Sequence, residues 1–203
     1  MRLFENLFGK KSKAKEERKA GAAEERGKFM PKPDIPIDEK FIINFTENGG
    51  KFLYCSDRRE VENNFYNILR ENNWKDEVCC FDEKLENSFG GFNLEFTTNP
   101  DADFCLLPCE FLIADSGSLL MTSNQIGERK LADLPYNFVV FAYTSQLIDT
   151  PDDGLRIINY RKQNLPTNIS SIKNFKEDAN QEGHFMSYGS VSKNLYLLLL
   201  EDL

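Results

Sequence analysis

The chain has 203 residues, of which 40% are hydrophobic, and a formal net charge of −8 at pH 7. This length fits one domain with extensions and supplies enough apolar material for a substantial core. The acidic balance argues against general nucleic-acid binding, which needs a basic surface to neutralise phosphates. No segment approaches the roughly 20 apolar residues that span a bilayer.

The five cysteines do not follow the closely repeated spacing of a zinc or iron–sulfur site. Most of them stand in apolar stretches, where a free thiol behaves as a small hydrophobic side chain. His184 is the single histidine, so the sequence has no material for a histidine-rich metal site. We therefore expect reduced thiols, a cytoplasmic location, and no metal or other cofactor on this chain.

An N-terminal extension and linker are predicted over residues 1–36. Residues 1–28 are basic, with nine Lys or Arg against five Asp or Glu. Within residues 1–19, a few apolar side chains at helical spacing precede a Lys-rich run, which resembles a small anchor for a membrane surface or a partner. The alternative is a frayed helical extension, because one short apolar patch gives weak membrane affinity. The Gly, Ala, Pro and charged residues of 20–36 indicate a linker.

A domain is predicted over residues 37–203. Helical apolar spacing over 38–50 indicates a first helix that stops at Gly49-Gly50, and a buried strand follows at 51–56. Asp57 with Glu60 three residues later forms a capping box, which predicts the start of a helix over 58–72.

The remaining elements alternate between short apolar strands and amphipathic helices. We expect a short helix over 83–89 and a helix from Asp152 to about Lys162, with Thr150 as its cap and Pro151 in its first position. The strand candidates are 77–82, 104–108, 118–123, 137–143 and 192–203. Continuous apolar strands between helices imply a mainly parallel sheet covered on both faces, so the predicted fold class is a three-layer α/β/α domain.

A small polar stretch, Asp115-Ser116-Gly117-Ser118, interrupts two apolar runs. In an open α/β sheet, ligands bind outside the carboxyl ends of the strands, where loops supply backbone N–H groups. Gly117 allows close approach of the backbone, and the serine hydroxyls add donors. These four residues therefore suit a small anionic ligand, although Asp-Ser-Gly is also an ordinary turn sequence.

Further polar residues are candidates for the same chemistry. Arg129 can offer a guanidinium fork to an anion, or can be a surface charge paired with a neighbouring carboxylate. Glu110 lies within an apolar stretch and is, with Asp115, a candidate catalytic carboxylate, but structural carboxylates also occupy such settings. Gly189 and Lys193, before the last strand, are secondary candidates for ligand binding.

The segment from Cys109 to Tyr143 resembles the central signature of the lactate-utilisation protein C family, also called the LUD domain. That signature combines Ala, an acidic residue, Ser or Thr, Gly, and Ser or Thr, followed by an Arg, a Leu-Pro pair and a hydrophobic strand. The matching residues here are Ala114, Asp115, Ser116, Gly117, Ser118, Arg129, Leu134 and Pro135. The likeness is clear over about residues 100–203, and over 37–99 it extends only to the order of elements.

This resemblance implies a fold related to the NagB/RpiA/CoA-transferase group. It also implies an accessory or ligand-binding role in the oxidation of L-lactate to pyruvate. The iron–sulfur clusters of such a system are expected on oxidoreductase partner subunits. Two other functions stay open, namely an autonomous enzyme acting on a CoA thioester, sugar phosphate or folate-like substrate, and a non-catalytic interaction protein.

One part of the sequence departs from the family pattern. The family has a polar Gly-Pro-Ser motif before its final strand, whereas residues 168–190 contain no such motif and end in Gly189-Ser190. We therefore expect a second anion-binding loop to be altered or lost in this chain.

Overall fold

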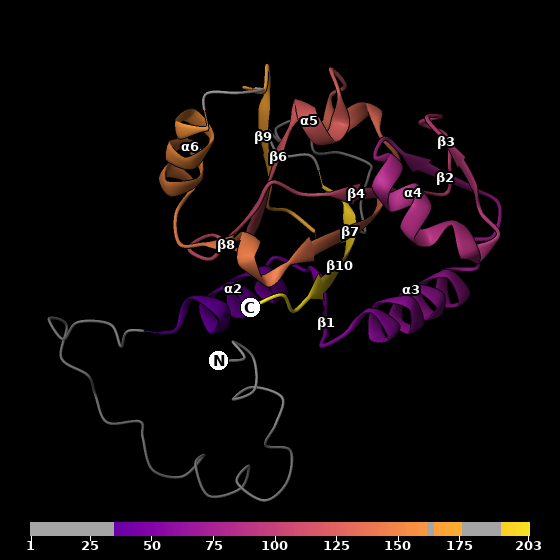
Figure 1. Cartoon of the computed structure of the whole chain (residues 1–203), viewed down its shortest axis with the longest axis horizontal. Coiled ribbons are helices and arrows are strands. Elements are labelled where there is room, and N and C mark those ends of the chain that lie inside the picture. Colours follow the sequence, from indigo (N-terminus) through magenta and orange to yellow (C-terminus); the bar gives the residue numbers. More distant parts are fainter. Residues whose placement is uncertain (1–34, 162–164, 176–191) are drawn as a thin grey trace, which may run out of the picture.

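The computed structural model describes residues 35–161, 165–175 and 192–203. They form a six-stranded and a four-stranded sheet with helices packed on the outer faces (Figure 1). The predicted N-terminal extension, apart from its last two residues, lies outside the described residues. Among the helices that are described, none is both long and apolar enough to cross a membrane.

The first two long helices begin and end close to the predicted residues. α2 spans Ile37–Glu47, and α3 spans Arg58–Asn72. The Asp57 side chain accepts a hydrogen bond from the backbone N–H of Glu60 at 2.9 Å, which confirms the N-cap. In a standard capping box the Glu60 carboxylate would accept from the backbone N–H of Asp57, but here it accepts from the backbone N–H of Ser56.

α6 spans Pro151–Tyr160 and also begins as predicted. The Thr150 hydroxyl accepts from the backbone N–H of Asp153, and the Asp153 carboxylate accepts from the N–H and hydroxyl of Thr150. This reciprocal pair satisfies donors that the helix leaves open at its start. The helix ends two residues before the predicted position.

The large sheet consists entirely of parallel neighbours. Its strands lie in the order β1 (Lys51–Cys55), β10 (Asn194–Leu200), β7 (Asn137–Tyr143), β4 (Phe104–Pro108), β2 (Glu77–Cys80) and β3 (Glu95–Thr97). The central strands β4, β7 and β10 are buried along most of their length. A parallel strand covered on both faces needs apolar side chains on both sides, which explains the continuous apolar sequence of β10.

Helices and a second sheet cover the two faces of the large sheet. On one face, α3 and α4 (Glu83–Phe89) bury an aromatic cluster that includes Phe65, Trp74 and Phe104. On the other face, Phe41 and Phe45 of α2 pack beside residues of the small sheet. The predicted three-layer α/β/α arrangement is therefore confirmed.

The sequence pattern did not predict that the strands form two separate sheets. Its strands lie in the order β8 (Leu147–Ile148), β5 (Phe111–Ile113), β6 (Ser118–Thr122) and β9 (Ile169–Ile172). β5 and β8 are parallel, but β6 is antiparallel to both β5 and β9, so the predicted mainly parallel arrangement holds for the large sheet and not for β6. The physical reason is a tight turn after β5, which folds the chain back on itself. α6 covers the outer face of this sheet through Ile158.

Short helical turns complete the chain between these strands. They are η1 (Gly90–Phe92), α5 (Ser123–Ile126), η2 (Leu131–Asp133) and η3 (Thr144–Gln146). α5 follows β6 directly, and η3 follows β7 at the carboxyl edge of the large sheet.

Candidate functional site

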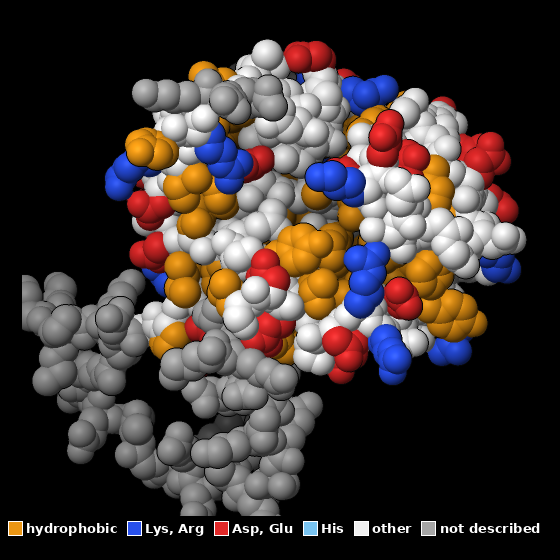
Figure 2. All heavy atoms as spheres, viewed as in Figure 1, with side chains coloured by type: hydrophobic (Ala, Val, Ile, Leu, Met, Phe, Trp, Pro, Cys, Tyr) orange, Lys and Arg blue, Asp and Glu red, His pale blue; other side chains and the backbone are white. Residues whose placement is uncertain are grey.

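Two residues that the sequence singled out separately, Glu110 and Arg129, lie near the carboxyl edge of the large sheet. Parallel strands end at the same edge, and ligands of open α/β sheets bind outside it. Glu110 comes shortly after the end of β4. Phe81, which contacts Arg129, comes directly after the end of β2. Figure 2 shows exposed hydrophobic side chains near the centre of the view, with Lys or Arg side chains beside them. In Figure 1, β4 and β7 lie near the centre of the view.

The Glu110 side chain is almost fully buried and is paired with side chains of two other segments. Its side chain is 9% exposed, and one carboxylate oxygen is paired with Arg161 at the end of α6. The other oxygen accepts a hydrogen bond from Gln125 Nε2 at 2.9 Å. The orientation of the Gln125 amide is fixed, because its oxygen accepts from the N–H and the hydroxyl of Thr122. The structure thus presents a carboxylate whose position is set by two other segments.

Gln146 of η3 stabilises the backbone next to this carboxylate. Its Nε2 donates to the carbonyl oxygen of Cys109 at 2.6 Å, and its Oε1 accepts from the N–H of Tyr143 at 2.7 Å. The ends of β4 and β7 are therefore connected through one amide side chain.

Arg129 reaches the carboxyl edge from the segment after α5. Its guanidinium carbon lies 4.4 Å from the centroid of the Phe81 ring, a cation–π contact. In the part of the chain that the structure describes, no carboxylate forms an ion pair with Arg129. The neighbouring Glu128 instead accepts a hydrogen bond from the hydroxyl of Thr167. The guanidinium therefore retains donors that suit a planar anion.

The Asp115–Ser118 turn lies at the other end of β5 from Glu110. Glu110 and Asp115 are five residues apart, and a strand rises about 3.3 Å per residue, so their Cα atoms are about 16 Å apart. The structure therefore brings Glu110 and Arg129 to one edge of the large sheet but places the turn elsewhere.

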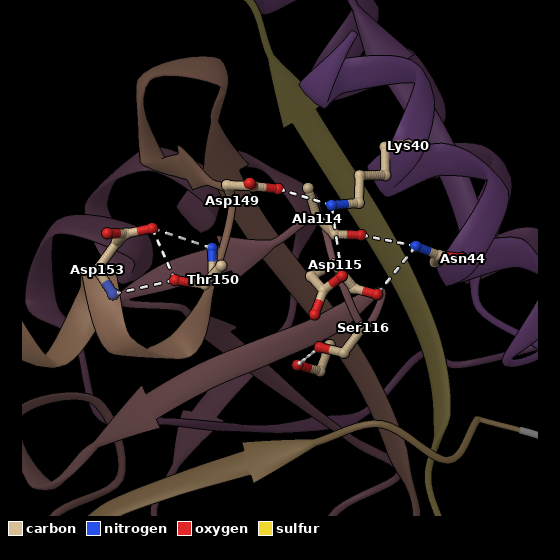
Figure 3. A network of polar contacts seen from close by, with 9 residues as sticks. Lys40, Asn44, Ala114, Asp115, Ser116, Asp149, Thr150 and Asp153 are labelled. Atoms are coloured by element: carbon tan, nitrogen blue, oxygen red, sulfur yellow. Dashed lines mark hydrogen bonds and ion pairs between the residues drawn. The ribbon is translucent and has the colours of Figure 1, made fainter. Parts of the chain in front are cut away.

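α2 and its C-cap residue hold this turn through two asparagine side chains, of which Figure 3 shows Asn44. Asn44 and Asn48 donate from Nδ2 to carbonyl oxygens of the turn, with shortest distances of 2.7 and 2.8 Å. The accepting oxygens are those of Ala114, Asp115, Ser116 and Gly117. The hydroxyls of Ser116 and Ser118 are hydrogen-bonded to each other at 2.7 Å. The geometry shows a docking role for the turn, and ligand binding by these residues stays a prediction.

Asp115 contributes to an ion-pair cluster beside the turn (Figure 3). The Lys40 ammonium lies 3.3 Å from an Asp115 carboxylate oxygen and 2.8 Å from one of Asp149. The hydrogen bond to Asp149 is the main reason why the pKa of Lys40 is raised. The backbone N–H of Asp115 is also engaged, since it donates to the Asp149 carbonyl at 2.9 Å. Two carboxylates facing one ammonium leave a negative charge, which disfavours an anion here.

The two secondary candidates have separate outcomes. Gly189 lies outside the described residues. Lys193 is buried, and its ammonium donates to the carbonyl oxygens of Leu134 and Pro135 at 2.8 and 2.9 Å. Burial lowers the pKa of Lys193 to about 8. Because Lys193 precedes β10, it lies at the amino edge of the sheet, where it anchors the segment that leads into β7.

The cysteines are free and buried. Burial raises the pKa of Cys55 and of Cys80 to about 11, so both are protonated near neutral pH. Within residues 35–161, 165–175 and 192–203, no group of three or more His, Cys, Asp or Glu side chains is placed to hold a metal ion.

Comparison with known proteins assigns these features to a family. The family model described as the LUD domain matches residues 97–200. The chain belongs to the LUD domain family. The match includes the Glu110 network, Arg129 and the turn, whereas α2 of this LUD-domain protein lies before it.

A solved structure shows the same fold. It is the crystal structure of a DUF162 family protein from Deinococcus radiodurans, with 11% sequence identity and a TM-score of 0.58. The likeness covers 82% of this chain and 96% of that one. No curated protein matches the chain.

Sequence reasoning missed several residues of the LUD-domain site. Gln125 had a detectable signal, because Thr122 and Gln125 have the spacing of a capping box. Arg161, Asn44 and Asn48 had no comparable signal, since each of them contacts a residue more than 50 positions away in the chain.

Gly117→Ala tests the docking of the turn. Gly117 has a φ of +61°, and a Cβ atom there would collide with the backbone of Asn44 and Phe45. We expect the variant to lose about 3 kcal/mol of unfolding free energy, measured by urea denaturation. Gly91→Ala is the matched control, because its Cβ meets no atom within 4 Å. Equal losses in the two variants would contradict the docking role.

Lys193→Met tests the buried ammonium. The pKa of Lys193 falls from an ordinary value near 10.5 to about 8 on folding, so between these values the folded chain binds fewer protons than the unfolded chain. The stability of the unaltered protein relative to Lys193→Met should therefore rise as the pH increases, by on the order of 2 kcal/mol between pH 7 and 10. Urea denaturation of both proteins at the two pH values measures this difference, and a constant difference would rule out a lowered pKa.

Proposed function

We propose that this LUD-domain protein is an accessory, ligand-binding component of organic-acid utilisation, in a system that oxidises L-lactate. The family match over residues 97–200 is the observation that carries the proposal. In this proposal the iron–sulfur clusters belong to oxidoreductase partner subunits, and the present chain binds or positions a small anion. The system would work in the cytoplasm, where five free thiols stay reduced.

The geometry favours the carboxyl edge of the large sheet as the place for that anion. Arg129 offers a guanidinium that is in no ion pair within the described residues, next to the ring of Phe81. The charge of Glu110 is already balanced by Arg161, so Glu110 competes little for Arg129. A 2-hydroxy acid has a carboxylate that suits the Arg129 fork.

The Asp115–Ser118 turn supports this proposed site from a distance. β5 begins one residue after Glu110, and β6 leads into α5, which carries Gln125. Fixing the turn against α2 therefore fixes both segments that hold the Glu110 carboxylate.

Titration with L-lactate tests the ligand site. We expect saturable binding by isothermal calorimetry, and a loss of about tenfold or more in affinity for Arg129→Ala, because a charge-assisted hydrogen bond is removed. The affinity of Arg129→Lys should lie between those of the unaltered chain and Arg129→Ala, since lysine keeps the charge but not the fork. Lys130→Ala, which removes an adjacent exposed charge, should bind as the unaltered chain does.

Asp115→Ala decides between the edge and the turn in the same titration. It should bind L-lactate normally if the turn acts only as a support. The opposite result would be a folded Asp115→Ala variant that no longer binds L-lactate and an Arg129→Ala variant that still does. That result would place the ligand at the turn and contradict the edge site.

Affinity purification of the full chain from its own cells, grown on L-lactate, tests the partners. We expect iron–sulfur oxidoreductase subunits to be recovered and identified by mass spectrometry. Arg129→Ala should recover the same partners, because Arg129 is assigned to the ligand. Recovery of no iron–sulfur protein with either form would contradict the accessory role.

A further inference from the structure

A surface pocket lies on the face of the large sheet that α3 and α4 cover. It is located between the end of α3 and the segment that leads into β3, toward the right of Figure 1. The cavity has a volume of about 420 Å³ and is lined by Tyr66, Leu69, Arg70, Asn73, Trp74, Lys75, Phe92, Asn93 and Leu94. All of these residues precede the LUD match, which begins at residue 97. Asn73, Trp74 and Lys75 lead into the amino end of β2, so the pocket lies away from the carboxyl-edge site.

Packed aromatic side chains form the floor of this pocket. The Trp74 ring is stacked on Phe104, with centroids 4.6 Å apart and an interplanar angle of 14°. Phe92 meets Phe65 edge to face, with centroids 4.9 Å apart. These contacts hold Trp74 and Phe92 in place before any ligand arrives, so a flat apolar ring would bind to a preformed surface.

The rim of the pocket is polar and positively charged. Arg70 and Lys75 are exposed, and neither takes part in an ion pair within the described residues. Asn73 and Asn93 add two side-chain amides, and no Asp or Glu is among the lining residues. On a chain with a net charge of −8, this is a local site for negative charge.

One side of the pocket leaves aromatic surface uncovered. The Tyr66 side chain is 55% exposed, whereas Trp74 is only 8% exposed. An aromatic group that reaches solvent beside two unpaired cations is poorly explained by packing within the chain. Together they match a ligand with both a ring and a negative charge.

We propose that this pocket binds a small anion that carries a flat aromatic ring, with the ring against Trp74 and Phe92 and the anionic group at Arg70 and Lys75. A nucleoside monophosphate and an aromatic carboxylate share this chemistry. The cavity falls within the range of about 300–1,000 Å³ that is usual for small-molecule sites. L-lactate has no ring, so this ligand would differ from the one proposed at the carboxyl edge.

Trp74 is the single tryptophan of the chain, so its fluorescence reports directly on the pocket. The full chain is titrated with AMP and with 4-hydroxybenzoate, the two ring-bearing anions, and with adenosine and inorganic phosphate. We expect a saturable change for at least one ring-bearing anion, and the better of the two identifies the ligand class. Adenosine lacks the charge and phosphate lacks the ring, so each should bind about tenfold more weakly or worse.

A double variant, Arg70→Ala with Lys75→Ala, tests the charged rim. Both side chains are exposed, and the affinity for the ring-bearing anion should fall by about tenfold or more. The matched control, Arg59→Ala with Lys84→Ala, removes the same charge from exposed positions outside the pocket and should leave the affinity unchanged.

Three results would overturn the proposal. The first is no saturable change with either ring-bearing anion. The second is binding of inorganic phosphate or adenosine as tight as that of AMP and 4-hydroxybenzoate. The third is an unchanged affinity in the double variant. The comparison of the four compounds uses the unaltered chain, so it stays decisive even if the double variant folds poorly.

Discussion

A close contact between the backbone at Gly117 and α2 fixes the position of the small sheet relative to the large one. Gly117 lies directly against the backbone of α2, where any side chain would collide. Asn44 and Asn48 then supply the hydrogen bonds that water would otherwise give to the carbonyl oxygens of the turn. Because α2 packs on the large sheet and the turn belongs to the small one, this contact sets the position of β5 and β6. The position of the Glu110 carboxylate depends on that arrangement.

Local signals were sufficient to predict the longer helices. Asp57 and Thr150 each satisfy backbone donors within three residues of their own position, so the sequence nearby contains the whole interaction. The apolar run of β10 was equally informative, because burial on both faces requires it whatever the neighbouring strands are. Fold class and most element positions followed from such short-range constraints.

The division into two sheets and the composition of the site could not be predicted in this way. Asp115-Ser116-Gly117-Ser118 suits a hairpin turn as well as a loop at a strand end, and its deciding partner, Asn44, lies 70 residues earlier. Arg161 is likewise 51 residues from Glu110. Propensity and periodicity describe a chain segment, whereas these contacts depend on where distant segments meet. Arg129 was identified by residue type, but its position beside Phe81 needed the fold.

The position of β10 has a consequence for how the protein is made. β10 lies between β1 and β7, and its Tyr196 is paired with Lys51 across 145 residues of sequence. Until residues 194–200 leave the ribosome, β1 has no neighbour in the large sheet, and one edge of β7 stays open. Closing such a long loop costs chain entropy before any contact is gained, which slows folding. The sheet therefore closes only after residues 194–200 have been made, and until then the nascent chain must keep two apolar strand edges apart from other chains.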